Sequence, residues 1–416
     1  MDPLQYRQDE LYIEDVPLSA VAARFDTPAY VYSASSISAA FRDFDEAFRS
    51  HDHLICYSVK ANSNLGVLGL LADLGSGFDI VSGGELQRVI QAGGNPEHVV
   101  FSGVGKQAWE IQAALNAGIA CFNVESLSEL QLIDRIAGKL DTIAPVSIRV
   151  NPDVDPGTHP YIATGLKENK FGVPAAEAIP LYMRLAEFSN LKVIGIDCHI
   201  GSQIMELQPF ITALDFVLAL VDDLEQRGVV LDHIDLGGGL GVRYNDEEPI
   251  EIGTYADAIL QTLGHRKHKL VFEPGRYIVA NAGVLLTSVI TLKSNEETRF
   301  AVVDAAMNDL IRPALYQSWQ NVAAVKLRHE DSITWQIVGP VCETGDFLAR
   351  NRALALREGD LVAISSAGAY GFVMSSNYNT RVRAAEIMVS GHEMQCVRER
   401  ENLDDLLRLE HRFCLP

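Results

Sequence analysis

The sequence lacks the excess of basic residues that proteins binding nucleic acids usually carry. Its 416 residues include 34 Lys and Arg against 55 Asp and Glu, a formal net charge of -21 at pH 7. Because a surface of this sign repels the phosphate backbone, we expect no nucleic-acid partner. A local basic pocket for a small anion is still compatible with this balance.

Long apolar segments are missing too. No uninterrupted apolar run reaches the roughly 18 residues that a membrane-spanning helix needs, and the most apolar stretch, residues 277–290, is interrupted by Asn281. The first residues, MDPL, do not have the basic and then apolar order of a secretory signal. We therefore predict a cytoplasmic protein with no membrane partner.

Cysteines are few and dispersed. None of the six belongs to a Cys-x-x-Cys pair, so the sequence has neither a zinc ribbon nor a thioredoxin-type motif, and we predict no metal site. In a cytoplasmic chain, scattered cysteines mostly serve as small apolar core residues. We expect five of the six to be buried in this way.

Short β-rich runs alternate with helical patterns between residues 54 and 275. In the helical patterns, such as residues 127–137 and 210–226, apolar residues recur every three or four positions. Eight repeats of this kind predict a (β/α)8 barrel of the TIM type, since a doubly wound sheet usually has fewer strands. The eight predicted strands are residues 53–60, 78–82, 98–102, 120–125, 146–151, 193–200, 233–237 and 270–273.

A second, mainly β domain is predicted after residue 280. Few helical patterns separate its strands, and a short strand at residues 11–16 is expected to complete the same domain. Its other predicted strands are residues 284–292, 299–304, 334–338, 361–364 and 384–389. The chain is therefore divided into a barrel at residues 30–278 and a β-sandwich or barrel-like domain made of residues 1–29 and 279–416.

Active sites of such barrels lie at the carboxyl ends of the strands, so polar residues there are the candidates. The first strand leads into Lys60, whose partly desolvated amine is a candidate nucleophile for an aldehyde. Taken alone, Lys60 is more simply explained as a rim lysine that extends into solvent. The sixth strand leads into His199, which is either a satisfied core residue or a ring lying flat against an aromatic cofactor.

Two glycine-containing loops follow the seventh and eighth strands, GGGLG at 237–241 and EPGR at 273–276. Backbone N–H groups in such loops approach an anion closely, and barrels commonly bind phosphate at these two strands. An amine, a phosphate cradle and a flat ring together match pyridoxal phosphate. Glu273 is placed to keep the ring nitrogen of that cofactor protonated.

The β domain has three polar runs of its own. Arg312 is suited to a carboxylate, CETGD at 342–346 sets a thiol beside two acids, and GAYGF at 368–372 places Tyr370 between small residues. Taken singly, each run is more simply explained as an ordinary turn.

Together these runs resemble the fold-type III pyridoxal-phosphate-dependent decarboxylases, most closely the branch that acts on meso-diaminopimelate. The resemblance covers almost the whole chain, and the order and spacing of the motifs make it specific. The run at 342–346 has Thr where many relatives have Ser, which should leave the roles of Cys342 and Glu343 intact. The matching runs are YSVKANSN at 57–64, FDIVSGGEL at 78–86, HIGSQ at 199–203, GGGLG at 237–241, EPGR at 273–276, CETGD at 342–346 and GAYGFVMSSNYN at 368–379.

The resemblance implies a carboxy-lyase of lysine biosynthesis that converts meso-2,6-diaminopimelate to L-lysine and CO2 at the D-centre, with pyridoxal 5'-phosphate as cofactor. It implies that Lys60 carries the cofactor, His199 stacks on its ring, Glu273 pairs with its nitrogen and Cys342 donates the final proton. The implied cofactor-binding residues are Lys60, Asp79, His199, Ser202, Gly238, Gly239, Glu273, Gly275, Arg276 and Tyr370. The implied substrate-binding residues are Arg276, Arg312, Tyr316, Glu343 and Tyr370. A homodimer with shared sites is also implied, in which the partner subunit contributes its cysteine and glutamate at 342 and 343.

Two alternatives stay open at this point. The same chemistry could act on ornithine, arginine, lysine or carboxynorspermidine, although Arg276 and Arg312 together favour a dicarboxylic substrate. A non-catalytic member of the fold could bind a partner or only carry pyridoxal phosphate, although the intact Lys60, Glu273 and Cys342 argue against it.

Overall fold

The computed structural model describes residues 3–155, 157 and 170–415, and it divides into two compact units. One unit contains residues 38–243 and 247–278. The other contains the residues up to Ile37, the short piece Tyr244–Asp246 and the residues from Val279 onward. Among the described residues, no helix is long and apolar enough to cross a membrane.

The first unit is a closed barrel of parallel strands. Within the described residues, eight strands pair in the order β5-β6-β7-β8-β9-β11-β12-β13, and β13 pairs with β5 to close the ring. The predicted (β/α)8 barrel is therefore confirmed. The strands are β5 (His53–Ser58), β6 (Gly77–Ile80), β7 (Val99–Phe101), β8 (Cys121–Val124), β9 (Ala144–Asn151), β11 (Leu191–Asp197), β12 (His233–Asp235) and β13 (Lys269–Phe272), with the short β10 (Val173–Pro174) beside β9.

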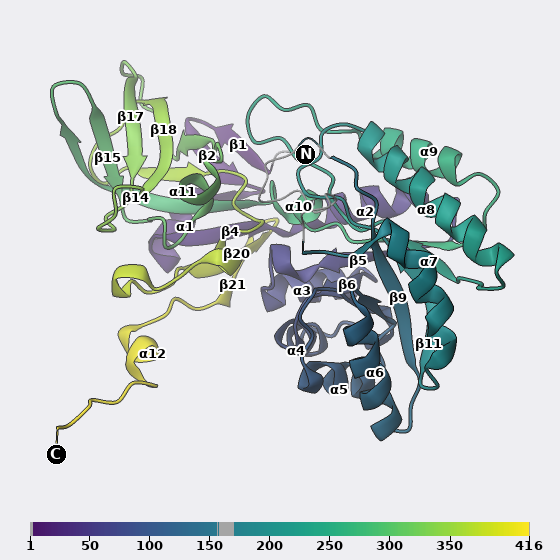
Figure 1. Ribbon diagram of the computed structural model, residues 1–416. Coiled ribbons are helices and arrows are strands. Elements are labelled where there is room, and N and C mark those ends of the chain that lie inside the picture. The colour runs from purple at the N-terminus through teal and green to yellow at the C-terminus, as the bar shows by residue number, and fades with distance from the viewer. Residues whose placement is uncertain (1–2, 156, 158–169, 416) are drawn as a thin grey trace. The chain divides into compact units, whose positions relative to one another are not determined.

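Helices surround the strands of this unit (Figure 1). Asn64, Ser82 and Ser126 accept backbone N–H groups at the starts of α3, α4 and α6, so these helices begin at side-chain caps directly after a strand. The helices are α3 (Leu65–Asp73), α4 (Gly83–Gln91), α5 (Ala108–Ala117), α6 (Leu127–Lys139), α7 (Ala175–Arg184), α8 (Gln208–Gln226), α9 (Ile252–Leu263) and α10 (Arg276–Val279).

Aromatic side chains attach helix α2 (Ala34–Phe48) to the last barrel strand. Phe44 and Phe48 pack against Phe272 of β13 with ring centroids 5.3 and 4.3 Å apart. Tyr255 of α9 lies 6.4 and 6.0 Å from the same two rings. Because each such pair contributes roughly 0.5–1.5 kcal/mol beyond its buried area, this cluster holds the strand that leads into Glu273.

The second unit is built on β-sheet, as predicted, and its long strand β14 (Gly283–Ser294) belongs to two groups of strands. The first half of β14 pairs with β4 (Ala29–Ser33) and β19 (Leu361–Ile364), and the second half pairs with β15 (Arg299–Val303). The remaining strands are β20 (Ala385–Ser390) and β21 (Glu393–Arg398) beyond β4, β17 (Ile333–Val338) and β18 (Phe347–Leu354) beyond β15, and β16 (Val322–Ala324) beside β19.

The N-terminal segment also belongs to this second unit. The single strand predicted at residues 11–16 is two short strands, β2 (Glu10–Ile13) and β3 (Val16–Pro17), separated by a turn at residues 14–15. They form a small sheet with β1 (Leu4–Arg7) and precede α1 (Leu18–Phe25). Side chains of β2, β3 and α1 share one apolar core with those of β4, β14 and β20. Because β4 pairs with β14 and β20, the boundary predicted at residue 30 falls inside a strand of the β domain.

The cysteines are all free, but fewer are buried than expected. Cys56, Cys121 and Cys198 are buried, whereas Cys396 is partly buried and Cys414 is exposed. The expectation of five buried cysteines was therefore wrong. Cys396 lies on β21, an edge strand, and Cys414 follows the short helix α12 (Leu403–Leu407) close to the chain end.

Candidate active site

Lys60 lies directly after β5, in a single turn of 3-10 helix at Val59–Ala61. Its Nζ is 2.5 Å from Oδ2 of Asp79 on β6, a fully buried carboxylate. Ser58 Oγ donates to the same oxygen at 2.7 Å, while Asp79 Oδ1 has no hydrogen-bond partner among the described residues. The Lys60 side chain is 36% exposed, so its amine can be reached although its counter-ion cannot.

The loop after β12 has a shape that only glycine fits. A Cβ atom on Gly238 would lie 2.2 Å from the carbonyl oxygen of Glu273, and one on Gly239 would lie 2.8 Å from that of Gly201. Gly237 has φ +63° and donates its N–H to Oδ1 of Asp235 at 2.8 Å. The loop therefore exposes backbone in place of side chains, which is typical of a phosphate cradle.

The loops after β11 and β13 are joined by Arg276, the first residue of α10. Its Nε and Nη2 donate to Ser202 Oγ at 3.3 and 3.1 Å, and its side chain is buried. In the preceding position, a Cβ on Gly275 would lie 2.9 Å from the Cβ of Ser58, so the loop packs closely against the end of β5.

His199 has a neutral imidazole. Burial, and then the positive charges of Arg149 and Lys60, lower its pKa well below the usual value. The N–H of Gly238 donates to His199 Nδ1 at 3.2 Å, so the ring hydrogen is on Nε2. A neutral ring held in this way can lie against another aromatic ring without bringing a positive charge to it.

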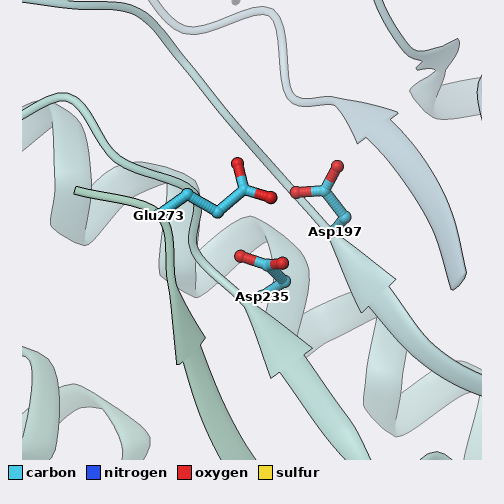
Figure 2. Close-up of side chains that lie close together, drawn as sticks. All are labelled: Asp197, Asp235 and Glu273. Atoms are coloured by element: carbon cyan, nitrogen blue, oxygen red, sulfur yellow. The ribbon is translucent and has the colours of Figure 1, made fainter. Parts of the chain in front are cut away.

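Three buried carboxylates meet at neighbouring strand ends (Figure 2). Asp197, Asp235 and Glu273 each place an oxygen within 4.8 Å of the others. Burial is the main cause that raises the pKa of all three, to about 6 for Asp235. Nearby carboxylates raise these pKa values further: Asp79 acts on all three, and Asp235 and Asp197 also act on Glu273. The cluster therefore keeps protons at pH values where exposed carboxyl groups have lost them.

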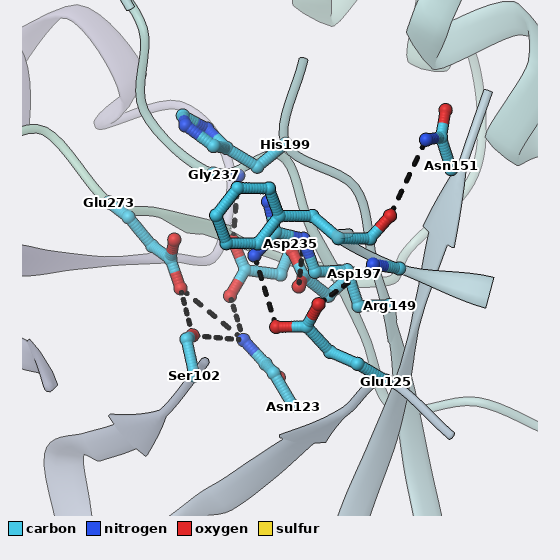
Figure 3. A network of polar contacts seen from close by, with 12 residues as sticks. Ser102, Asn123, Glu125, Arg149, Asn151, Asp197, His199, Asp235, Gly237 and Glu273 are labelled. Atoms are coloured by element: carbon cyan, nitrogen blue, oxygen red, sulfur yellow. Dashed lines mark hydrogen bonds and ion pairs between the residues drawn. The ribbon is translucent and has the colours of Figure 1, made fainter. Parts of the chain in front are cut away.

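Neutral and cationic donors surround this cluster (Figure 3). Ser102 Oγ and Asn123 Nδ2 donate to Glu273 Oε1 at 3.2 and 3.3 Å. Arg149 of β9 lies 3.3 Å from Glu125 Oε1 by its Nη1 and 3.8 Å from an oxygen of Asp197 by its Nε. The positive charge of Arg149 is thus shared between Glu125 and Asp197.

The sequence reasoning did not select Ser102, Asn123, Asp197 or Asp235. All four lie at or near the carboxyl end of a predicted strand, which is the criterion that selected Lys60. Applying the criterion to every predicted strand would have found them.

Five predicted residues belong to the β domain, and two of them lie on α11 (Arg312–Tyr316). The buried guanidinium of Arg312 has its central carbon 4.6 Å from the ring centre of Tyr244, which belongs to the same unit. Stacking of this kind sets the plane in which the guanidinium can meet a carboxylate. Tyr370 has φ +54°, a left-handed conformation that is uncommon for a tyrosine and concentrates at functional positions.

Cys342 and Glu343 are exposed on a tight turn. Asp346 holds the turn by accepting the N–H groups of Val341 at 2.9 Å and Met307 at 2.7 Å. The N–H of Cys342 donates to Asn379 Oδ1 at 2.7 Å. The backbone is thereby fixed, while the thiol and the carboxylate remain available to a ligand or to another chain.

Comparison with known proteins gives one consistent result. Residues 34–280 match the family of the pyridoxal-dependent decarboxylase, pyridoxal binding domain. The chain is 59% identical over 407 residues to diaminopimelate decarboxylase of Pseudomonas fluorescens, covering 98% of both chains. Crystal structures of diaminopimelate decarboxylase complexed with L-lysine are also similar. The enzyme from Helicobacter pylori has a TM-score of 0.91 at 43% identity, with 94% of this chain and 98% of that chain covered. The enzyme from M. jannaschii has a TM-score of 0.95 at 36% identity, with 99% and 98% covered.

Proposed function

This chain belongs to the pyridoxal-dependent decarboxylases, in the diaminopimelate decarboxylase family, and we propose that it decarboxylates meso-2,6-diaminopimelate at the D-centre to give L-lysine and CO2. The observation that carries the proposal is the barrel mouth. There an accessible lysine, a loop that only glycine fits and a buried glutamate lie at the ends of neighbouring strands. A pyridoxal-phosphate enzyme of this kind uses an amine for the aldehyde, a cradle for the phosphate and a partner for the ring nitrogen.

The residues of the barrel mouth fit pyridoxal phosphate. Lys60 would hold its aldehyde carbon, backbone N–H groups of the glycine loop and Ser202 would hold its phosphate, and His199 would lie against its ring. When bound, the cofactor supplies an electron-accepting ring for the electrons of the broken carbon–carboxyl bond. The other residues proposed to contact it are Asp79, Gly238, Gly239, Gly275, Arg276 and Tyr370.

The role proposed for Glu273 follows from the charges around it. Burial, and then repulsion from neighbouring carboxylates, raise the pKa of Glu273, so its ionised form is disfavoured unless a positive charge lies beside it. A protonated ring nitrogen next to Glu273 replaces repulsion between like charges by an attractive pair. As the ionised carboxylate of this pair, Glu273 would favour protonation of the ring nitrogen.

We assign recognition of the substrate, and a proton donor, to Arg276 of the barrel and to residues of the β domain. Arginine binds a carboxylate through two parallel hydrogen bonds, so Arg276 and Arg312 are suited to a substrate with two carboxylates. We assign Glu343 to the distal ammonium group and the aromatic side chains of Tyr316 and Tyr370 to the substrate. The Cys342 thiol is assigned as the general acid that returns one proton to one face of the product.

We further propose that the chain works as a cytoplasmic homodimer with shared active sites, to which the partner's Cys342 and the partner's Glu343 belong. The support is their exposure on a rigid turn, together with the motif pattern. A thiol and a carboxylate that are exposed on a fixed turn can reach into the active site of another subunit.

The proposal is tested by measuring CO2 release with added pyridoxal phosphate from meso-diaminopimelate, L-ornithine, L-arginine and L-lysine. We expect release from diaminopimelate alone, with L-lysine as product. Release from a basic monocarboxylate would keep the fold and cofactor but contradict the roles given to Arg276, Arg312 and Glu343. A lack of release from all four substrates, with the cofactor bound, would favour a non-catalytic member of the family.

A further inference from the structure

Asn123 is a fully buried residue near the end of β8. The backbone carbonyl oxygen of Asn123 accepts a hydrogen bond from Lys106 Nζ at 2.7 Å. The same ammonium group lies 2.6 Å from Glu129 Oε1, and both side chains are buried. The backbone of Asn123 is therefore held by a buried ion pair.

The side-chain amide of Asn123 faces the cluster (Figure 3). Its Nδ2 has three acceptors, Ser102 Oγ at 3.2 Å, Glu273 Oε1 at 3.3 Å and Asp235 Oδ2 at 3.4 Å. Its Oδ1 is buried and has no hydrogen-bond partner among the described residues. Leaving this acceptor unpaired costs stability, whereas the donor side of the amide faces three acceptors. The amide is therefore placed for the groups to which it donates.

The balance of charges around the cluster makes this donor important. Among the described residues, the charged groups that act on the cluster are the carboxylates of Asp79, Glu125, Asp197, Asp235 and Glu273 and the cations of Lys60 and Arg149. Negative groups outnumber positive ones, so the neutral donors Ser102 and Asn123 are needed to favour the ionised form of Glu273.

We propose that Asn123 is a positioning residue whose amide orients the Glu273 carboxylate and keeps it ionised, so that the proton shared with the cofactor stays on the ring nitrogen. The proposal rests on the proposed function, because it assigns the ring nitrogen to Glu273. Without the amide, Glu273 loses a donor and its affinity for the proton increases. The proton then moves from the nitrogen to the carboxylate, with no net change in the number of protons or electrons.

The test uses holoenzyme reconstituted with pyridoxal phosphate labelled with 15N in the ring. The 15N chemical shift of the bound ring reports whether the nitrogen is protonated. We expect Asn123→Leu to move this resonance toward the unprotonated value and to lower kcat about 10- to 100-fold, with KM for the substrate changed less than about twofold. Ser102→Ala removes the other donor to the same oxygen and should move the resonance in the same direction.

Ser147→Ala is the matched control. Ser147 is the cross-strand partner of Asn123 on β9, and its buried Oγ also has no hydrogen-bond partner among the described residues. Its loss should leave the 15N resonance unchanged. Adding Asp235→Asn to Asn123→Leu supplies a new amide beside Glu273, and we expect it to move the resonance back toward the wild-type position.

An unchanged 15N resonance in Asn123→Leu, with lower thermal stability, would overturn the proposal and leave Asn123 a structural residue. If that variant does not fold, an unchanged resonance in Ser102→Ala has the same consequence. Wild-type protein that binds the cofactor and releases CO2 separates this result from failure of the proposed function. Wild-type protein that binds no cofactor would contradict the proposed function itself.

Discussion

Asp235→Asn is predicted to stabilise the cofactor-free protein at neutral pH. Asp235 is fully buried at the end of β12. One of its oxygens accepts the N–H of Gly237, and the other faces the amide of Asn123. An asparagine has the same shape and keeps the first acceptor. The Asn123 amide can rotate so that its unpartnered Oδ1 accepts from the new amide group.

The size of the expected stabilisation follows from the pKa of Asp235. Burial is the largest cause that raises this pKa, from 3.8 to about 6. An acid whose pKa is higher in the folded state makes its full contribution to stability at pH values below its pKa in the unfolded state. It loses this contribution as the pH rises through the folded pKa. The difference between the two pKa values corresponds to about 3 kcal/mol in the free energy of unfolding. At pH 8 we therefore expect the free energy of unfolding of Asp235→Asn to be about 3 kcal/mol higher than that of the wild type. Near pH 4 the two free energies should become equal.

Urea unfolding of both cofactor-free proteins, followed by circular dichroism between pH 4 and pH 8, measures this difference. Asp331→Asn removes the same charge from an exposed position and should show little effect across the range. The reasoning is refuted if Asp235→Asn is less stable than the wild type at pH 8, or if its advantage does not depend on pH.

Other predictions concern the active site directly. Lys60→Ala should abolish both turnover and covalent attachment of the cofactor; protein mass after borohydride reduction measures the attachment, and a retained adduct would exclude Lys60. Cys342→Ala should keep the cofactor but lower kcat roughly 10²- to 10⁴-fold, and an unchanged kcat would mean that the proton comes from another group. Mixing these two inactive variants should restore about a quarter of wild-type activity if the sites are shared in a dimer, and none if each chain has its own site. Gly238→Ala should weaken cofactor binding at least tenfold in equilibrium dialysis, because the new Cβ would meet the carbonyl oxygen of Glu273 at 2.2 Å. Unchanged affinity would show that this loop is not the phosphate cradle.

Much of the architecture could be predicted from local patterns. The eight barrel strands lie where alternation of β-rich and helical runs predicted them, because periodicity is carried by residues close together in sequence. The glycine loops after β12 and β13 and the lysine after β5 are local features too. Their order along the chain was specific enough to indicate the family, which the comparisons confirm.

The sheet partners of the N-terminal segment could not be predicted in the same way. Strand β4 reads as an ordinary buried strand, and only pairing with β14 and β20, more than 200 residues away, places it in the β domain. The partial exposure of Cys396 likewise depends on β21 being an edge strand, which strand pairing determines and composition does not.

The amino-acid sequence specifies which chemical groups this protein carries at its strand ends and in its loops. Folding specifies which of these groups meet. Asn123 and Glu273 are 150 residues apart, yet closure of the barrel brings the amide within 3.3 Å of the carboxylate. The same closure removes Asp197, Asp235 and Glu273 from water and sets them side by side. Their proton affinity depends on burial and on distance between charges, and both quantities exist only once the strands have paired.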